Sequence, residues 1–91
     1  MSRRILKFEV PPGASAIGTA DEPRFLAAGW QGEMLVVWVE ATVGTGVRTS
    51  VYGAVTGDGV PSDAEYVGTA QRSMPDGHPF VAHVYRQRHD V

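Results

Sequence analysis

The stretch Trp30-Gln31-Gly32-Glu33-Met34-Leu35-Val36-Val37-Trp38-Val39-Glu40-Ala41 decides the fold of this chain. From Met34 to Val39 no polar residue interrupts either alternating face. This pattern predicts a strand that is covered on both sides at the centre of a packed sheet. Gln31-Gly32 in front of it predicts a tight reversal, because glycine readily adopts the positive φ of hairpin turns. Arg24 to Trp30 is therefore the expected antiparallel partner.

The segments on either side of this hairpin predict further short strands. They are bounded by turn-forming Gly, Pro, Asp and Ser residues, and most alternate apolar and polar side chains. The expected strands are Ile5–Val10, Ala14–Thr19 as a short edge strand, Arg24–Trp30, Met34–Val39, Val47–Val55, Glu65–Gln71 and Phe80–Arg86. The predicted fold class is all-β: a small antiparallel sandwich or open barrel of six or seven short strands, with no substantial helix.

The totals indicate one folded domain. The 91 residues suffice for a single modest core, which we expect over about residues 5–86, with 87–91 as a frayed polar tail. An apolar content of 43% with 20% charged residues is typical of a globular protein. The formal net charge of −2 provides no general attraction to nucleic acid or to an anionic membrane.

The sequence also predicts the compartment. It has no Cys, whereas a small secreted domain usually carries disulfides, so we expect a reducing cytoplasm. The charged N-terminal residues have no apolar run behind them, which argues against a signal peptide. No stretch approaches the roughly 18 apolar residues of a membrane span, so we expect no membrane partner.

The three histidines do not form a recognisable metal site. His78, His83 and His89 are spaced five and six residues apart, and zinc sites usually take closer or hairpin-paired spacings. His83 shares a predicted strand face with Val81 and Tyr85. The simplest interpretation of His83 is a hydrogen-bonded residue on a sheet surface, and a specific binding role is the alternative. We predict no metal and no cofactor.

No set of residues with catalytic spacing is present either. Asp58 and Asp63 lie in a loop of turn-forming residues, where Asp accepts backbone hydrogen bonds. The serines lack a glycine-flanked nucleophile elbow, and no glycine-rich phosphate-binding motif occurs. We therefore predict no catalytic residues and no enzymatic activity.

Basic residues gather at the two ends of the chain, at Arg3, Arg4, Lys7, Arg72, Arg86 and Arg88. If the first and last strands were neighbours, these residues and Tyr85 would form a positive stripe able to hold a phosphate or a single strand. Charges that protect sheet edges from aggregation explain the same residues at less cost. Nucleic acid is therefore not a favoured partner.

Aromatic residues supply the other binding candidates. Trp30 and Trp38 are most simply core residues, yet Trp30 with the three tyrosines is a large aromatic content for a small core. An exposed aromatic residue can anchor an interface, and the open strand edges leave a homo-oligomer as open as a monomer. The residues selected as a ligand or partner site are Arg72, His83, Tyr85, Arg86 and Trp30.

Several pieces in their order resemble an uncharacterised family of small phage and prophage proteins, a domain of unknown function. The matching pieces are Ile5–Val10, Trp30–Gly32 with Leu35–Val39, Thr56–Pro61, Tyr66–Gln71 and Pro79–Tyr85. The resemblance covers about residues 5–85. It implies a phage or prophage origin and the cytoplasm of a bacterial host cell, and it brings no known activity or catalytic residue.

These observations predict a non-enzymatic accessory protein that binds a host or phage protein, including a role against host defence. One alternative is an oligomer that sequesters a small phosphorylated ligand or nucleotide at Arg72, Arg86 or Arg88. Another alternative is a minor component of the virion.

Overall fold

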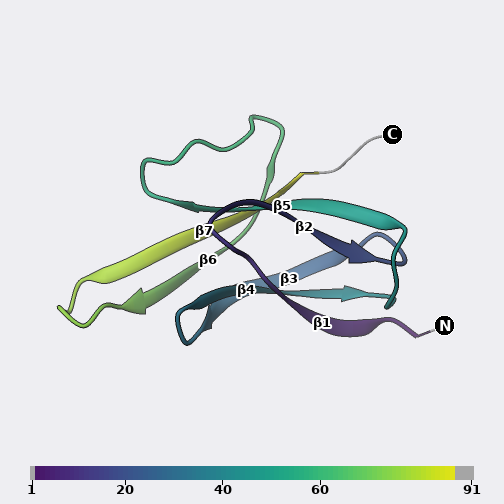
Figure 1. The fold of residues 1–91 in the computed structure, drawn as a ribbon, viewed down its shortest axis with the longest axis horizontal. Coiled ribbons are helices and arrows are strands. Elements are labelled where there is room, and N and C mark those ends of the chain that lie inside the picture. Colours follow the sequence, from purple (N-terminus) through teal and green to yellow (C-terminus); the bar gives the residue numbers. More distant parts are fainter. Residues whose placement is uncertain (1, 88–91) are drawn as a thin grey trace.

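The computed structural model describes residues 2–87, which form seven strands and no helix. The strands are β1 (Arg4–Glu9), β2 (Gly13–Thr19), β3 (Arg24–Gln31), β4 (Met34–Ala41), β5 (Val47–Val55), β6 (Glu65–Ser73) and β7 (Pro79–Gln87). Sheet A has the order β1-β4-β3 and sheet B the order β2-β5-β7-β6. Every pair is antiparallel. The predicted all-β fold is confirmed, and the two open sheets form a sandwich, not a closed barrel (Figure 1).

The hairpin expected around Gly32 is the centre of sheet A. Gln31 pairs with Met34, which leaves a two-residue turn, and Gly32 adopts a φ of 60°. Glycine at the first turn position matches the twist of the flanking strands and suits this positive φ. β4 lies between β1 and β3, so the predicted central position is confirmed.

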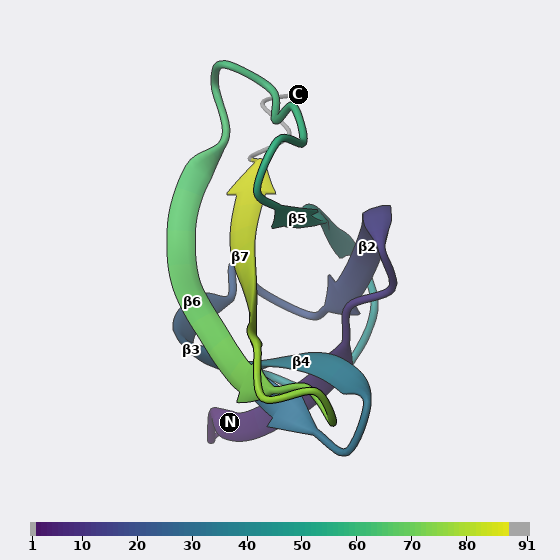
Figure 2. The same cartoon turned by 90° about the vertical axis from the view of Figure 1, so that its left-hand side faces the viewer.

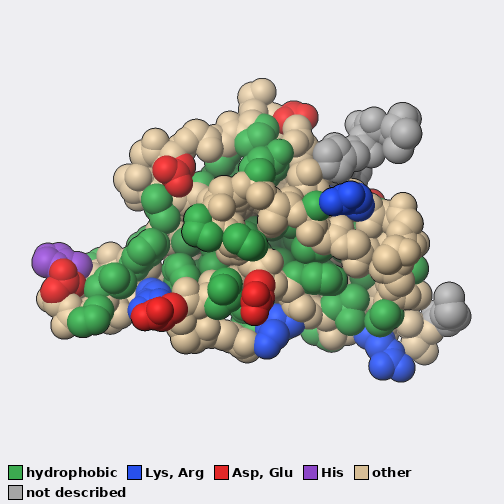
Figure 3. Space-filling model, in the orientation of Figure 1, with side chains coloured by type: hydrophobic (Ala, Val, Ile, Leu, Met, Phe, Trp, Pro, Cys, Tyr) green, Lys and Arg blue, Asp and Glu red, His purple; other side chains and the backbone are tan. Residues whose placement is uncertain are grey.

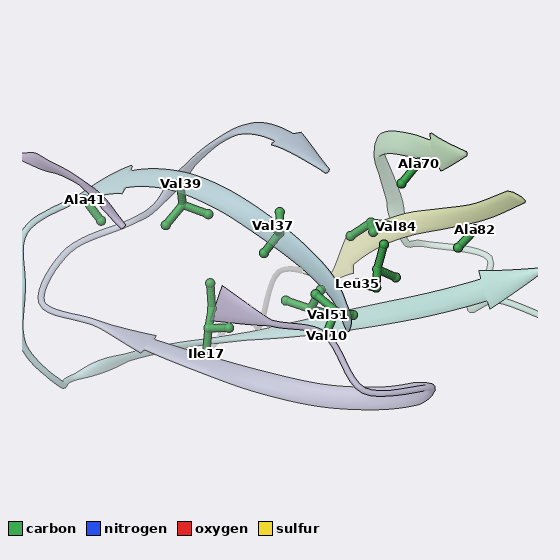
Figure 4. Packing of buried hydrophobic residues seen from close by; sticks show 10 residues of the cluster. All are labelled: Val10, Ile17, Leu35, Val37, Val39, Ala41, Val51, Ala70, Ala82 and Val84. Atoms are coloured by element: carbon green, nitrogen blue, oxygen red, sulfur yellow. The ribbon is translucent and has the colours of Figure 1, made fainter. Parts of the chain in front are cut away.

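The two faces of β4 are covered in different ways. Its core-side residues Leu35, Val37, Val39 and Ala41 pack against side chains from sheet B, among them Ile17, Val51 and Val84 (Figure 4). On the other face no described strand covers β4 (Figure 2). There the Trp38 ring lies so close to Gly29 that a Cβ at this glycine would be 3.0 Å from it. Val36 on this face is only 1% exposed, so β4 is covered on both sides as predicted, by side chains within sheet A on this face.

The two sheets meet along β3 and β6. Gly68 permits this approach, since a Cβ at this position would lie 3.4 Å from the Ala28 backbone nitrogen. On the opposite side the chain passes from β1 in sheet A to β2 in sheet B through Val10, whose N–H donates to the Leu35 carbonyl at 2.8 Å. The sandwich is therefore joined along one side, while β1 and β2 remain edge strands on the other.

Residues 56–64 connect β5 to β6 across β7, on the outer face of sheet B. Asp63 in this loop accepts a hydrogen bond from Gln87 Nε2 at 2.7 Å, and Gln87 Oε1 accepts one from the Tyr52 hydroxyl at 2.7 Å. Gln87, expected at the start of a frayed tail, is thus the last residue of β7. Arg88 and His89 lie outside the described residues. Residues 2–87 include no helix with the length and apolarity to cross a bilayer.

Candidate binding cleft

A cleft of about 480 Å³ opens at the end of the sandwich where the β3–β4 turn faces the β6–β7 hairpin. Most of its lining is apolar. The lining residues are Val10, Pro12, Trp30, Glu33, Met34, Leu35, Gly53, Val55, Asp58, Arg72, Met74, Phe80 and Ala82. Apolar side chains gather over this part of the surface, with acidic and basic side chains beside them (Figure 3). This size and lining are typical of ligand sites in small proteins.

Trp30 and Phe80 bring aromatic rings from the two sheets together in the cleft. Their ring centroids are 5.5 Å apart with an interplanar angle of 73°, an edge-to-face pair. The Arg72 guanidinium lies 5.4 Å from the centre of the Trp30 ring and donates to the Gly32 carbonyl at 3.2 Å. Arg72 thus links β6 to the β3–β4 turn across this end of the sandwich.

The Trp30 indole also carries a polar atom without a partner. Its Nε1 is buried and has no hydrogen-bond acceptor among the described residues. Buried donors are almost always satisfied in folded proteins, so such a group calls for an explanation. An acceptor supplied by a bound molecule would satisfy it.

Two exposed carboxylates lie at the edge of the cleft. Glu33 follows Gly32 in the β3–β4 turn, and Asp58 accepts the Val55 N–H at 3.0 Å in the loop after β5. Within residues 2–87 neither carboxylate forms an ion pair. Since Arg72 is held on Trp30 and Gly32, the groups left for an outside charge are acidic.

Arg86, another of the selected residues, lies elsewhere and is occupied within the protein. It is only 7% exposed on the core side of β7. Its guanidinium donates to Glu22 Oε1 at 2.8 Å and to the Pro23 carbonyl at 3.2 Å, and it lies 5.2 Å from the Phe25 ring centre. Arg86 therefore ties the turn before β3 to sheet B.

The positive stripe considered from the sequence does not form. β1 and β7 belong to different sheets, so the condition for that stripe is not met. Arg72 lies opposite Phe80, six residues before Arg86 on β7, which places the two arginines about 20 Å apart along the sheet. A single phosphate group cannot contact both arginines of one chain. The alternative of a phosphorylated ligand held by an oligomer stays a prediction.

His83 and Tyr85 lie on the outer face of sheet B, away from the cleft. Tyr85 is paired with Tyr66, and their ring centres are 5.7 Å apart. His83 Nδ1 lies 2.9 Å from Thr69 Oγ1, in hydrogen-bond distance. Of the five selected residues, Trp30 and Arg72 meet in the cleft, and His83 and Tyr85 share the outer face of sheet B.

Two carboxyl groups with shifted pKa values, Asp21 and Asp76, hydrogen-bond to neighbouring residues outside the cleft. The backbone N–H and the hydroxyl of Thr42 hydrogen-bond to Asp21, and with Arg3 they hold the pKa of this carboxyl below its ordinary value. In the β6–β7 turn, hydrogen bonds from His78 lower the pKa of Asp76. Over residues 2–87, no three potential ligands among His, Asp and Glu gather closely enough to hold a metal ion.

Sequence reasoning missed most of the cleft. Met34, Met74 and Phe80 lie beside the two tight turns, while Glu33 and Asp58 lie within turns. The available signal was the position of large apolar residues directly at hairpin ends, where a sheet does not need them for its own core. Which hairpins face each other depends on the packing of the two sheets.

Comparison with known proteins assigns the family. The model of the family described as Domain of unknown function (DUF7352) matches residues 1–91. The chain belongs to this family. No curated protein and no solved structure matches it significantly.

Proposed function

We propose that this DUF7352 domain is a non-enzymatic binding module that holds a segment of a partner protein in the cleft. The observation that carries the proposal is the apolar cleft of about 480 Å³, with the Trp30–Phe80 ring pair in its lining. Aromatic pockets at protein surfaces are typical positions of binding hot spots. Met34 and Met74 add flexible side chains that adapt to varied apolar ligands.

The charges around the cleft specify the chemistry of the segment. Glu33 and Asp58 present carboxylates, and Arg72, the cation among the described lining residues, is already engaged by Trp30 and Gly32. The complementary ligand is a large apolar side chain flanked by Lys or Arg. A backbone carbonyl of this ligand would give the buried Trp30 Nε1 its missing acceptor.

The cleft supplies its own probes for a binding test. Met34 and Met74 both line the cleft. We expect short peptides with one Leu, Phe or Trp between lysines to shift the ¹³C-methyl resonances of Met34 and Met74. The same peptides with glutamates in place of lysines should bind at least about tenfold more weakly. Unchanged methyl resonances with every lysine peptide at millimolar concentration would refute the proposal.

Matched lysine substitutions separate the cleft from the general surface. Met34 is 39% exposed at the cleft, and Ile5 is 62% exposed on the outer face of sheet A. Met34→Lys places a cation where the ligand's cation is expected and should abolish peptide binding. Ile5→Lys adds the same charge away from the cleft and should leave binding unchanged. Equal loss in both variants would indicate nonspecific attraction.

The biological setting belongs to the same proposal. The phage origin and the cytoplasm of the bacterial host rest on the sequence resemblance, whereas the role against host defence rests on the small size of the domain, its open sheet edges and its aromatic residues. In a lysate of infected cells, the wild type and Ile5→Lys should both retain one stoichiometric host or phage protein. Met34→Lys should lose that protein, and the lysine peptide should compete it off. Detection of the chain in purified particles would instead favour a virion component.

A further inference from the structure

β2 is an edge strand without the usual protection against pairing. It pairs with β5 over Gly13–Thr19 in continuous register, and within residues 2–87 it has no other strand partner. The segment contains no charged residue, no proline and no register shift. It is the last strand on its side of sheet B, and the connection from β1 passes beside it (Figure 2).

The other three edge strands are protected. β1 carries Arg4, Lys7 and Glu9, and β3 and β6 each contain a register shift. β3 and β6 also lie against each other where the sheets meet. Charges, bulges and cover are the devices by which proteins block unwanted strand pairing. Among the four described edge strands, β2 is the one that lacks these protective features. This indicates that the β2 edge pairs with another strand.

We propose that the strand it receives is β2 of a second copy of this chain. With a two-fold axis at Ala16, Ala16 lies opposite its own copy, Ser15 opposite Ile17, and Ala14 opposite Gly18. Each pair places residues of the same face together, so the core side of one sheet continues into the core side of the other. The two four-stranded sheets become one continuous sheet of eight strands.

The side chains of β2 permit this contact. Ala14, Ala16 and Gly18 are exposed but small, so the neighbouring outer faces meet without steric conflict. Because β2 has no charge, self-pairing brings no like charges together. A contact built mainly from one strand pair is smaller than the roughly 1,600 Å² of a standard interface, so the dimer should dissociate on dilution.

Sedimentation equilibrium from micromolar to millimolar concentration tests this proposal. The wild type should shift from monomer to dimer as its concentration rises. Ala16→Lys places two lysines against each other at the axis and should remain monomeric. Gln71→Lys, an exposed position on the opposite edge strand β6, should dimerise like the wild type. A monomeric wild type at every concentration, or an unchanged dimer in Ala16→Lys, would overturn the proposal.

A charge-pair experiment excludes misfolding as the cause of a monomer. Ala16→Asp alone should also be monomeric, but an equimolar mixture with Ala16→Lys should form a heterodimer, because opposite charges then face each other at the axis. Failure of the mixture to associate, with both variants folded by circular dichroism, would also overturn this arrangement.

Discussion

At the scale of single residues, Asp21 joins the two sheets at the end opposite the cleft. Its carboxylate accepts the Thr42 N–H at 2.9 Å and the Thr42 hydroxyl at 2.8 Å. Arg3 donates to the same carboxylate at 3.0 Å and to the Glu40 carbonyl at 2.6 Å. The turn after β2 in sheet B is thereby fastened to the end of β4 in sheet A.

These contacts predict how stability depends on pH. The folded-state pKa of Asp21 is lowered, chiefly by the Thr42 backbone N–H, so its carboxylate stabilises the fold above the ordinary value of 3.8. This contribution is lost as the pH falls through the folded pKa. Asp21→Asn should therefore lower the urea midpoint at pH 7, and the gap to wild type should shrink as the pH falls below 3.8.

The salt dependence of stability distinguishes the Thr42 hydrogen bonds to Asp21 from the charge of Arg3. The Thr42 hydrogen bonds outrank the charge of Arg3 as causes of the lowered pKa, and salt screens only the latter effectively. Most of the difference in urea midpoint should persist at high ionic strength. A gap that is independent of pH would show that the carboxylate charge does not contribute.

For Arg86, the alternation of side chains along the strand predicts burial but not the partner of the guanidinium. The alternation along β7 sets Phe80, Ala82 and Val84 against His83 and Tyr85, and by the same alternation Arg86 belongs to the core side. Its burial was therefore readable from the sequence. Its partner Glu22 was not, because that contact depends on the turn before β3 folding back over sheet B.

At the scale of elements, Gly53 of β5 and Gly18 of β2 differ in the space that is left for a side chain. A Cβ at Gly53 would lie 3.3 Å from both Leu35 and Val10 side chains, inside the packed region between the sheets. A Cβ at Gly18 would meet nothing within 4 Å. Both glycines lie in strands, where replacement by alanine reduces the entropy lost on folding.

We predict opposite effects of the two alanine substitutions on the free energy of unfolding. Gly53→Ala should lower it by about 1–3 kcal/mol, since the added methyl group forces two buried side chains to move. Gly18→Ala should leave it unchanged or raise it by up to about 1 kcal/mol. Urea denaturation at low protein concentration measures both, and equal effects would contradict the packing at Gly53.

The strands themselves were largely predictable. Alternation and turn residues place all seven within a few residues of their observed bounds, because each strand has one core-facing side. The register shifts between Phe25 and Ala27 and between Tyr66 and Gly68 were not foreseen. A bulge adds a residue to one strand only, and the sequence of that strand alone does not reveal which residue is extra.

At the scale of the whole molecule, the cleft arises from sheet order. Trp30 on β3 and Arg72 on β6 are far apart in the chain and meet because the two sheets join along these strands. Local patterns predict strands but carry no information about which edges of two sheets meet. For this reason the sequence indicated Trp30 and Arg72 as binding candidates but did not show that they meet in one cleft. It also did not show that Arg86 lies away from them.

The two proposed surfaces together predict avidity. Pro12 lines the cleft directly before β2 begins at Gly13, and antiparallel self-pairing places Gly13 opposite Thr19 of the partner copy. The two clefts of a dimer therefore lie at opposite ends of the shared strand pair, separated by at least about 20 Å. A dimer whose two clefts both hold immobilised peptide dissociates more slowly from a surface densely coated with that peptide than a monomer does.

Surface plasmon resonance with the lysine peptide measures this difference. At high peptide density the wild type should dissociate at least about tenfold more slowly than Ala16→Lys. At low density the two should bind alike, because position 16 is not part of the cleft lining. Gln71→Lys should match the wild type at both densities. Weaker binding by Ala16→Lys at low density would mean that the β2 edge and the cleft are not independent, and equal retention at high density would exclude a bivalent dimer.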